Sequence, residues 1–296
     1  MTAGEAQSDL LEPAVPVVLE VVEVRRENAG AVTLFLSLAG AEGRSGLHME
    51  QFVPGRFFML WIPRVDEKPY AVSYVGEDRI GVTVQQRGPF STRLCAMQPG
   101  QRVGLRGPYG RGYWGYEAHG DGAGVALMGG GCGMAVLAPL KDRLPEAILV
   151  QGARRADGLF FTERFPDQVI FTDDGSAGRR GFPTEWLEEQ SAEVRMVYTC
   201  GPEEMMVRVV EICRREGVEC QASLERYMKC GIGVCGQCEL NGRRVCVEGP
   251  TFSADELACM PSFGRRRRDK AGRVTGISPA DVCPSGPGAP APDEES

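Results

Sequence analysis

Four closely spaced cysteines are the residues of this chain whose pattern most directly indicates chemistry. Their spacing is C-x4-C-x2-C-x7-C, where x is any residue, and they are Cys230, Cys235, Cys238 and Cys246. The first three match a spacing that binds a [2Fe-2S] cluster, which needs four converging thiolates. Glycines allow the sharp turns that bring backbone N–H groups to the cluster sulfurs, and they stand at Gly231, Gly233 and Gly236. The stretch therefore predicts an iron–sulfur site.

The fourth cysteine follows a predicted hairpin. Asn241-Gly242 is a favoured two-residue turn between the short runs 239–240 and 243–245. A structural zinc site, a disulfide pair and ordinary core cysteines are the alternatives. Zinc ribbons use C-x2-C pairs on both sides, whereas only the pair Cys235 and Cys238 has that spacing. The spacing and the glycines favour the cluster, and the alternatives stay open.

The composition is that of a globular protein with many cysteines. The chain has 296 residues, a formal net charge of −7 and 25% charged residues. The negative charge argues against nucleic acid as a partner, and no apolar run is long enough to cross a membrane. Residues 1–12 do not resemble a secretory signal, so we expect a cytoplasmic protein. Eleven cysteines, an odd number, fit a metal or cluster role better than a disulfide framework.

The first part of the chain is predicted to be an antiparallel β-barrel. Apolar and polar residues alternate through 14–38 around a turn at 27–30, which predicts a hairpin. Further short strands are separated by proline and glycine and are expected at 56–62, 70–74, 79–85 and 101–105. A short helix at 91–97 is expected to cover one end of the barrel. We therefore expect a first domain at residues 14–118.

After a glycine-rich linker, strands begin to alternate with helices, which predicts a parallel α/β sheet. The strands are expected at 124–128, 147–150, 168–172 and 195–199. The predicted fold class is thus α+β and multidomain, with the α/β domain at residues 119–216 and a small C-terminal cluster module at 217–264. Residues 265–296 are expected to be a basic run, interpreted as solvated rather than as a docking patch, followed by a disordered tail.

Two loops of the predicted sheet have features of a dinucleotide site. A glycine triplet stands between a strand and a helix, where backbone N–H groups bind a pyrophosphate, at Gly129, Gly130 and Gly131. A second loop follows another strand of the same sheet and should meet the first at its carboxyl edge, at Cys200, Gly201 and Pro202. A tight turn without a ligand and an inert core cysteine are the alternatives.

Other polar residues near this edge are weaker candidates. Asp173 and Asp174 end a third strand, where a carboxylate can accept a ribose hydroxyl, although an Asx turn is the simpler interpretation. Arg154 and Arg155 follow the second strand, where NADP would place its 2′-phosphate, although loop arginines are usually solvated. Cys200 is a possible contact of the nicotinamide ring, and no catalytic side chain is predicted.

Several segments together closely resemble one family. They are 66–73, 107–113, 129–136, 172–176, 200–202 and 223–238. The chain resembles, from about residue 16 to residue 273, the electron-transfer subunit of class 1B dihydroorotate dehydrogenase, within the ferredoxin reductase-like flavoproteins. The resemblance implies a barrel that binds FAD, an α/β domain that binds NAD, and a [2Fe-2S] module.

The resemblance also implies the flavin contacts. The family's Arg-Pro-x-Ser/Thr motif is matched by Lys68, Pro69, Tyr70 and Ala71. Lysine keeps the positive charge but not the bidentate fork, and Ala71 offers no hydroxyl, so Ser73 is the expected substitute. A second flavin segment resembles 88–94, and the residues it places near the flavin are Gln85, Gly88, Ser91 and Thr92.

A nicotinamide transfers two electrons as a hydride, whereas a [2Fe-2S] cluster accepts one at a time, so a flavin must stand between them. The resemblance therefore implies a path from substrate through the FMN of a partner catalytic subunit, the cluster and FAD to NAD⁺. It also implies a heterotetramer of the two kinds of subunit.

Two other functions stay open. A related flavin and iron–sulfur subunit of a sulfhydrogenase or an NADH-dependent ferredoxin oxidoreductase would differ only in its partner. A non-enzymatic redox sensor or zinc-stabilised interaction protein is suggested by Lys68 and Ala71, which depart from the flavin motif. The absorption spectrum of the purified protein separates this last function from the others.

Overall fold

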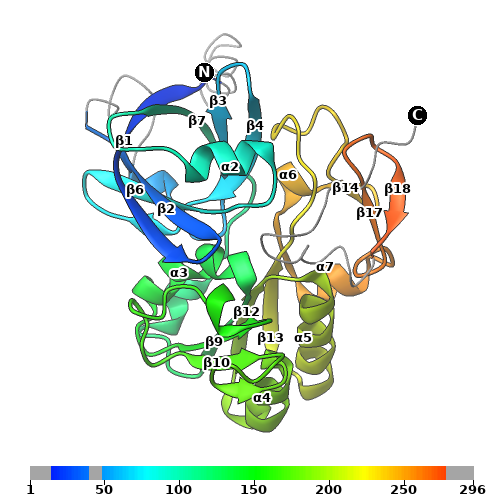
Figure 1. Ribbon diagram of the computed structural model, residues 1–296. Helices are drawn as coiled ribbons and strands as arrows, with labels where there is room; N and C mark the ends of the chain where they lie inside the picture. Colours follow the sequence, from blue (N-terminus) through cyan, green and yellow to red (C-terminus); the bar gives the residue numbers. More distant parts are fainter. Residues whose placement is uncertain (1–14, 40–48, 278–296) are drawn as a thin grey trace.

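The computed structural model describes residues 15–39 and 49–277 (Figure 1). The predicted disordered tail, the predicted start of the first domain at residue 14 and the segment 1–12 lie outside these residues. Within the described part of the chain, no helix has both the length and the apolar character needed to cross a membrane.

Seven antiparallel strands form the first sheet, in the order β4-β3-β7-β1-β2-β6-β5. Their bounds are β1 (Val17–Asn28), β2 (Ala31–Ser37), β3 (Phe57–Ile62), β4 (Asp66–Ala71), β5 (Tyr74–Val75), β6 (Arg79–Gln85) and β7 (Arg102–Tyr109). The sheet curls around a single core that includes Leu34, Phe58 and Ile80. Helix α2 (Pro89–Cys95) covers this core with Phe90 and Leu94, and Figure 1 shows it across the strands.

The strand predicted at 70–74 is wrong in one respect, because two strands share these residues. β4 ends at Ala71 and pairs with β3, whereas β5 begins at Tyr74 and pairs with β6 at the other end of the sheet. Between them the Ser73 hydroxyl is buried and lies 2.7 Å from the Thr83 hydroxyl. The chain therefore passes from one end of the sheet to the other here, which alternation of apolar residues alone does not reveal.

The second sheet also has seven strands, in the order β11-β10-β9-β8-β12-β13-β16, and all neighbouring strands are parallel except β13 and β16. The bounds are β8 (Val125–Gly130), β9 (Ile148–Ala153), β10 (Val169–Thr172), β11 (Arg179–Arg180), β12 (Met196–Cys200), β13 (Glu219–Ser223) and β16 (Thr251–Ser253). One face packs against α3 (Met134–Arg143). The other packs against α4 (Pro183–Gln190) and α5 (Glu203–Glu216).

Short 3-10 turns connect several of these elements. They are η2 (Met49–Gln51), η3 (Tyr116–His119), η4 (Gly131–Gly133), η5 (Ala156–Gly158) and η6 (Ser191–Glu193). The turn η4 joins β8 to α3 at the carboxyl edge of the second sheet. It therefore holds Gly131, the last glycine of the triplet, at the edge where such sheets bind ligands.

The cysteine-rich segment joins the second sheet rather than standing apart from it. β13, which the sequence analysis did not predict, runs parallel to β12, and β16 pairs with it in the antiparallel sense. Between them lie β14 (Glu239–Leu240), β15 (Arg243–Arg244) and α6 (Val245–Glu248), and α7 (Ala254–Ala258) follows. The turn at Asn241-Gly242 has positive φ at both residues and confirms the predicted hairpin.

The basic run is not simply solvated. Residues Arg266–Arg268 form β17, which pairs with β18 (Val274–Gly276). The Arg268 guanidinium lies 2.9 Å from the Glu239 carboxylate of β14. The hairpin therefore packs beside the cysteine-rich segment, as Figure 1 shows.

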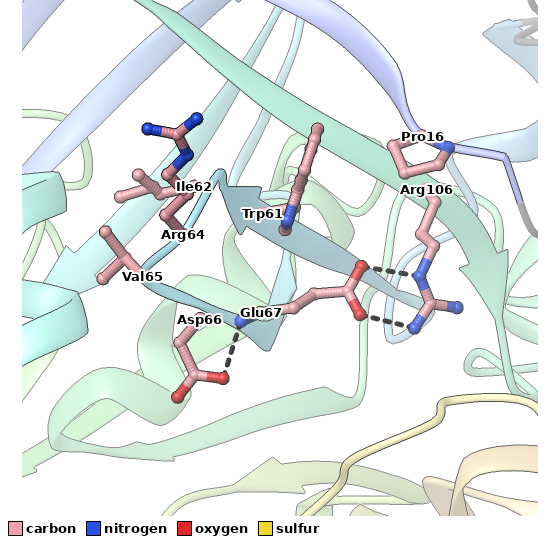
Figure 2. A pocket seen from close by; sticks show the side chains of 8 residues that line it. All are labelled: Pro16, Trp61, Ile62, Arg64, Val65, Asp66, Glu67 and Arg106. Carbon is pink, nitrogen blue, oxygen red and sulfur yellow. Dashed lines mark hydrogen bonds and ion pairs between the residues drawn. The ribbon is translucent and has the colours of Figure 1, made fainter.

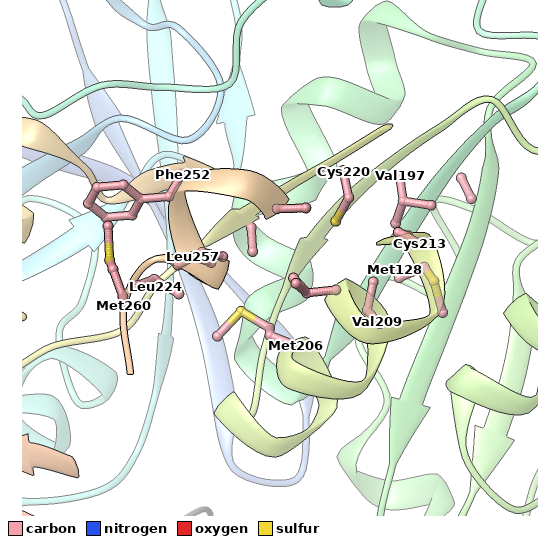
Figure 3. Close-up of a cluster of buried hydrophobic side chains, with 14 of the residues drawn as sticks. Met128, Val197, Met206, Val209, Cys213, Cys220, Leu224, Phe252, Leu257 and Met260 are labelled. Atoms are coloured by element: carbon pink, nitrogen blue, oxygen red, sulfur yellow. The ribbon is translucent and has the colours of Figure 1, made fainter. Parts of the chain in front are cut away.

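One core joins all three parts of the chain. It includes Phe57, Met59 and Tyr109 from the first sheet together with Met228 and side chains of the cysteine-rich segment and of α5. Figure 3 shows part of it, in which Met206, Val209 and Cys213 of α5 face the second sheet and Phe252, Leu257 and Met260 lie beside them. Burial of this continuous apolar surface fixes the parts relative to one another.

Candidate functional site

A cleft of about 670 Å³ lies where the first sheet, the second sheet and the start of the cysteine-rich segment meet. The size and mixed lining suit an organic cofactor. Its wall contains many of the predicted flavin and nicotinamide residues, namely Lys68, Pro69, Tyr70, Ala71, Gln85, Gly88, Ser91 and Cys200. Residues 223–228 close the side nearest the cysteines.

Strand β4 carries the residues of the predicted flavin motif. The Lys68 ammonium lies 2.6 Å from the Asp66 carboxylate and 5.2 Å from the centre of the Tyr227 ring. Burial lowers the pKa of Lys68, but the interactions with Asp66 and Tyr227 together outweigh burial, and the net pKa is raised. The Lys68 side chain is therefore protonated and contributes a positive charge to the cleft, whereas Ala71 contributes only a methyl group.

The hydroxyls predicted to assist the flavin have different surroundings. The Ser73 side chain is buried against Thr83, which itself lines the cleft, so Ser73 does not reach the cleft. The Ser91 hydroxyl lines the cleft and accepts hydrogen bonds from the N–H groups of Arg87 and Gly88 at the start of α2. Thr92 is outside the cleft lining, and its hydroxyl accepts a hydrogen bond from Gln86 at 3.3 Å.

The two predicted dinucleotide loops lie side by side. Cys200 at the end of β12 pairs in register with Gly129 of β8. A Cβ at Gly133 would overlap the Cys200 carbonyl, so glycine is required there for the close approach of the loops. Gly131 differs, because its φ is +51° and a Cβ there would meet no atom within 4 Å. The open space at Gly131 suits a ligand at the carboxyl edge.

The Cys200 thiol is buried and lines the cleft. Burial raises its pKa well above the ordinary value, so the thiol is neutral at physiological pH. The glycines Gly129, Gly130 and Gly131 and the pair Gly201 and Pro202 belong to the same two loops but not to the cleft lining. A neutral, buried thiol fits a packing contact with a ring better than nucleophilic chemistry.

The acidic candidates lie farther along the same edge. Asp173 follows β10, and its N–H donates to the Ala153 carbonyl at the end of β9. Asp174 accepts a hydrogen bond from the Ser176 N–H at 2.9 Å, which is an Asx turn. Arg155 lies near Asp157 and Asp174 on an exposed surface. None of these residues lines the cleft, so they are separated from the flavin candidates.

Sequence reasoning missed the wall formed by residues 223–228. The Cys132 thiol lies 3.4 Å from the Glu225 carboxylate and 3.6 Å from the Arg87 guanidinium, so three segments meet across the cleft. Arg226 is buried, and its Nε has no hydrogen-bond partner among the described residues. The available signal was the alternation of apolar and polar residues through 218–224 after α5, which continues the strand-helix-strand pattern and so ends at the same sheet edge.

The four candidate cluster cysteines lie on one loop and the short helix after it. Cys235 is exposed and Cys230 is partly buried, whereas Cys238 and Cys246 are buried. The Cys246 N–H donates to the Cys238 sulfur at 3.4 Å. The thiols associate as two pairs, Cys230 with Cys235 and Cys238 with Cys246.

The surroundings of Cys230 and Cys238 favour thiolates. Burial raises the pKa of Cys230, but hydrogen bonds from backbone N–H groups such as that of Cys235 outweigh it and hold the pKa at about 7. The hydrogen bond from Cys246 lowers the pKa of Cys238 to about 6, and the same contact raises the pKa of Cys246. Thiolates are the form that binds iron.

The four thiols are not grouped for a single metal ion. Among the described residues, no group of three or more His, Cys, Asp and Glu side chains is placed to hold a single metal ion. A [2Fe-2S] cluster differs from a zinc ion, because its four ligands are divided between two irons. Two thiol pairs on a loop with inward N–H groups therefore fit the cluster better than a single zinc ion.

Curated relatives match most of the chain. A relative from Thermoplasma acidophilum is 40% identical, and the match covers 74% of this chain and 86% of the relative. A relative from Methanothermobacter thermautotrophicus is 41% identical, and the match covers 88% of this chain and 97% of the relative. Both are named as probable electron transfer subunits of dihydroorotate dehydrogenase B (NAD⁺). The chain belongs to this family. The resemblance stated from the sequence is confirmed, and the chain is an oxidoreductase subunit.

A family model covers the cysteines. The iron-sulfur cluster binding domain of dihydroorotate dehydrogenase B matches residues 225–258, which contain all four candidate ligands. Membership in the electron transfer subunit family and this match together support an iron–sulfur cluster, FAD and NAD as the cofactor set.

Solved structures confirm the predicted fold class. An NADH-dependent reduced ferredoxin-NADP oxidoreductase aligns with a TM-score of 0.66 and 24% identity over 83% of this chain and 93% of its own. A ferredoxin NADP⁺ reductase from Neisseria gonorrhoeae aligns with a TM-score of 0.55 and 18% identity, over 68% of this chain and 92% of the reductase. At these identities the likeness concerns the fold, which is ferredoxin reductase-like.

Proposed function

We propose that this chain is the electron-transfer subunit of an NAD-dependent dihydroorotate dehydrogenase of pyrimidine biosynthesis. In this role it carries electrons from a partner FMN subunit, by way of a [2Fe-2S] cluster and FAD, to NAD⁺. The proposal is supported by family membership, because the chain matches most of the length of curated relatives that carry this name.

One observation carries the proposal at the level of the site. The segment that closes the cleft continues directly into the cluster loop, since Met228 lines the cleft and Cys230 is the first candidate ligand. A flavin in the cleft and a cluster on the loop are thereby adjacent in the fold. When bound, FAD supplies the conversion between a hydride pair and single electrons that the nicotinamide and the cluster require.

The residues divide into two groups in this proposal. FAD is held in the cleft by contacts from Lys68, Pro69, Tyr70, Ala71, Gln85, Gly88 and Ser91, with Thr92 next to Ser91 on α2 and Ser73 supporting Thr83 from behind. NAD is held at the second sheet by contacts from Gly129, Gly130, Gly131, Asp173, Cys200, Gly201 and Pro202. The buried Arg226 Nε and the Glu225 carboxylate are additional polar groups on the cleft wall.

The proposed domains follow the same division. Residues 14–118 hold FAD, residues 119–216 hold NAD, residues 217–264 hold the cluster through Cys230, Cys235, Cys238 and Cys246, and residues 265–296 form a basic segment and tail. The proposal places the subunit in the cytoplasm, in a heterotetramer with an FMN-containing catalytic subunit. The exposed Cys235 makes the cluster loop the side that faces this partner.

Purification of the native complex tests the function. We expect a tagged chain to copurify with an FMN-containing subunit, and the complex to reduce NAD⁺ when dihydroorotate is added without oxygen. The absorption spectrum should contain a flavin band and broad iron–sulfur absorbance, both bleached by NADH. A different FMN-free partner would indicate a related electron-transfer complex, and a colourless zinc protein would contradict the proposal.

A further inference from the structure

We propose that Arg106 and Glu67 form a charged clamp that positions the first cysteine of the cluster loop on the first sheet, and that its two opposite charges balance each other in their effect on the reduction potential of the cluster. Arg106 acts as a positioning residue, because it contacts the backbone of the ligand rather than the reacting atoms. The inference rests on the proposed function, since it requires a bound cluster.

Arg106 lies on β7, and its guanidinium donates hydrogen bonds to three different residues. Its Nε and Nη2 donate to the two Glu67 carboxylate oxygens, each at 2.6 Å, as Figure 2 shows. Its Nη2 also donates to the Cys230 carbonyl at 2.8 Å, and its Nη1 donates to the Tyr109 hydroxyl at 2.8 Å. Only 10% of the arginine side chain is exposed. The clamp therefore ties β4, β7 and the cluster loop together.

The loop also packs tightly on this part of the first sheet. A Cβ at Gly231 would lie 3.3 Å from both the Met59 side chain and the Tyr109 ring. Tyr109 thus contacts the cluster loop directly while Arg106 holds its hydroxyl. Lys68, next to Glu67 on β4, lies over Tyr227 of the same segment. The strand with the proposed flavin lysine therefore also bears the acidic half of the clamp.

The two charges should act on the cluster in opposite directions. A cluster held by four thiolates gains negative charge when it is reduced, so a nearby positive charge favours reduction and a nearby negative charge opposes it. Because both side chains are largely buried, the pair is screened less than exposed charges. In the intact clamp the two effects largely cancel. Removing one partner leaves the charge of the other uncompensated.

The test is a redox titration of the cluster-loaded full chain, followed by the electron paramagnetic resonance signal of the reduced cluster. We expect Arg106→Gln to disfavour reduction about tenfold, which is about 59 mV more negative for one electron. Glu67→Gln should shift the potential in the positive direction. The double variant should return towards the wild-type value. A purely structural role would not produce shifts of opposite sign.

Two further variants complete the experiment. Arg106→Lys keeps the positive charge, so its reduction potential should be closer to that of the wild type than the potential of Arg106→Gln. If Arg106→Gln binds no cluster, Arg106→Lys is compared with Glu67→Gln instead. Arg179→Gln is the matched control, because Arg179 makes a two-pronged pair with Glu189 at the far edge of the second sheet. Arg179→Gln should leave the reduction potential of the cluster unchanged.

The outcomes separate this inference from the proposed function. Unchanged potentials, or shifts of the same sign in Arg106→Gln and Glu67→Gln, would overturn the clamp while leaving the function in place. A wild-type chain that binds no iron–sulfur cluster would overturn the proposed function itself.

Discussion

At the scale of single residues, β4 gives the cleft a positive charge but no serine or threonine hydroxyl. Lys68 is kept charged by Asp66, whereas Ala71 is one of the lining residues that offers no polar side-chain atom. Ser73 does not replace the missing hydroxyl, because its side chain is buried against Thr83. A hydroxyl group introduced at position 71 should therefore increase the affinity for FAD.

We predict that Ala71→Ser tightens FAD binding. One added hydrogen bond contributes about 1 kcal/mol, which is roughly a fivefold lower Kd. Fluorescence titration of the flavin-free protein with FAD measures the change. Ala29→Ser, on an exposed turn between β1 and β2, is the control and should have no effect. A weaker affinity in Ala71→Ser would argue that the cleft does not hold the flavin in this way.

The cysteines allow a second prediction at this scale. Cys235→Ala removes an exposed candidate ligand and should reduce the iron and acid-labile sulfide bound per chain to less than half, while FAD stays bound. Cys259→Ala removes another exposed cysteine, at the end of α7, and should keep both. Normal iron and sulfide content in Cys235→Ala would remove Cys235 from the ligand set.

At the scale of elements, the turn between β8 and α3 separates structural glycines from an open one. Gly133 is fixed by the Cys200 carbonyl, whereas Gly131 faces open space. Asparagine tolerates positive φ, so Gly131→Asn should fold normally. We expect it to raise the KM for NADH in flavin reduction at least about tenfold, because the side chain would occupy the proposed dinucleotide site.

Gly217→Asn is the matched control for this measurement. Gly217 also has positive φ and open surroundings, but it lies at the end of α5 away from the sheet edge. Its kinetics with NADH should be unchanged. Equal KM values in the two variants would show that the dinucleotide does not pass over Gly131.

Helix α5 is anchored by a buried ion pair. Arg226 and Glu203 have 2% and 10% of their side chains exposed, and Arg226 Nη2 lies 2.7 Å from Glu203 Oε1. Arg226→Met leaves the carboxylate buried without its partner and should cost about 3–5 kcal/mol, seen as a lower Tm. Replacing both residues by methionine should recover most of this loss.

Arg208→Met is the control for the ion pair. Arg208 lies on the same helix and pairs with Glu188, but both side chains are largely exposed. Such a pair contributes about 0–1 kcal/mol, so the Tm should change little. A fall in Tm as large as that of Arg226→Met would mean that burial is not the cause.

Local patterns explain which elements the sequence predicted. Strand β6 follows from the alternation of apolar and polar residues, and the Asn241-Gly242 hairpin follows from turn chemistry. The missed elements depend on distant partners. β13 joins β12 through a helix, β5 crosses to another strand, and the Arg266–Arg268 strand is held by pairing with β18.

The site was predictable in the same measure. Motif spacing predicted the cysteines of the cluster loop, and the family resemblance predicted the proposed flavin contacts on β4, because each set of residues is close in the sequence. The wall at 223–228 and the Arg106 clamp were not found, since Arg106 contacts Glu67 and Cys230 only after three segments are brought together. Burial of Ser73 likewise depends on its contact with Thr83.

At the scale of the whole molecule, two sheets and a cysteine-rich segment meet at one cleft and share one core. The Arg111 guanidinium links the end of the first sheet to the Thr251 carbonyl and the Glu256 carboxylate, which adds to the contacts made by Arg106. These contacts fix the spacing between the cleft and the cluster loop. A fixed spacing suits electron transfer between two bound groups.

The central claim is that NADH and the cysteine loop are connected through a flavin in this chain. It is tested most directly by adding NADH to the purified chain without oxygen and recording flavin absorbance together with the electron paramagnetic resonance spectrum. The account predicts bleaching of the flavin and the signal of a reduced [2Fe-2S] cluster, with only the bleaching left in Cys235→Ala. A wild-type chain whose flavin bleaches while no cluster signal develops would contradict it.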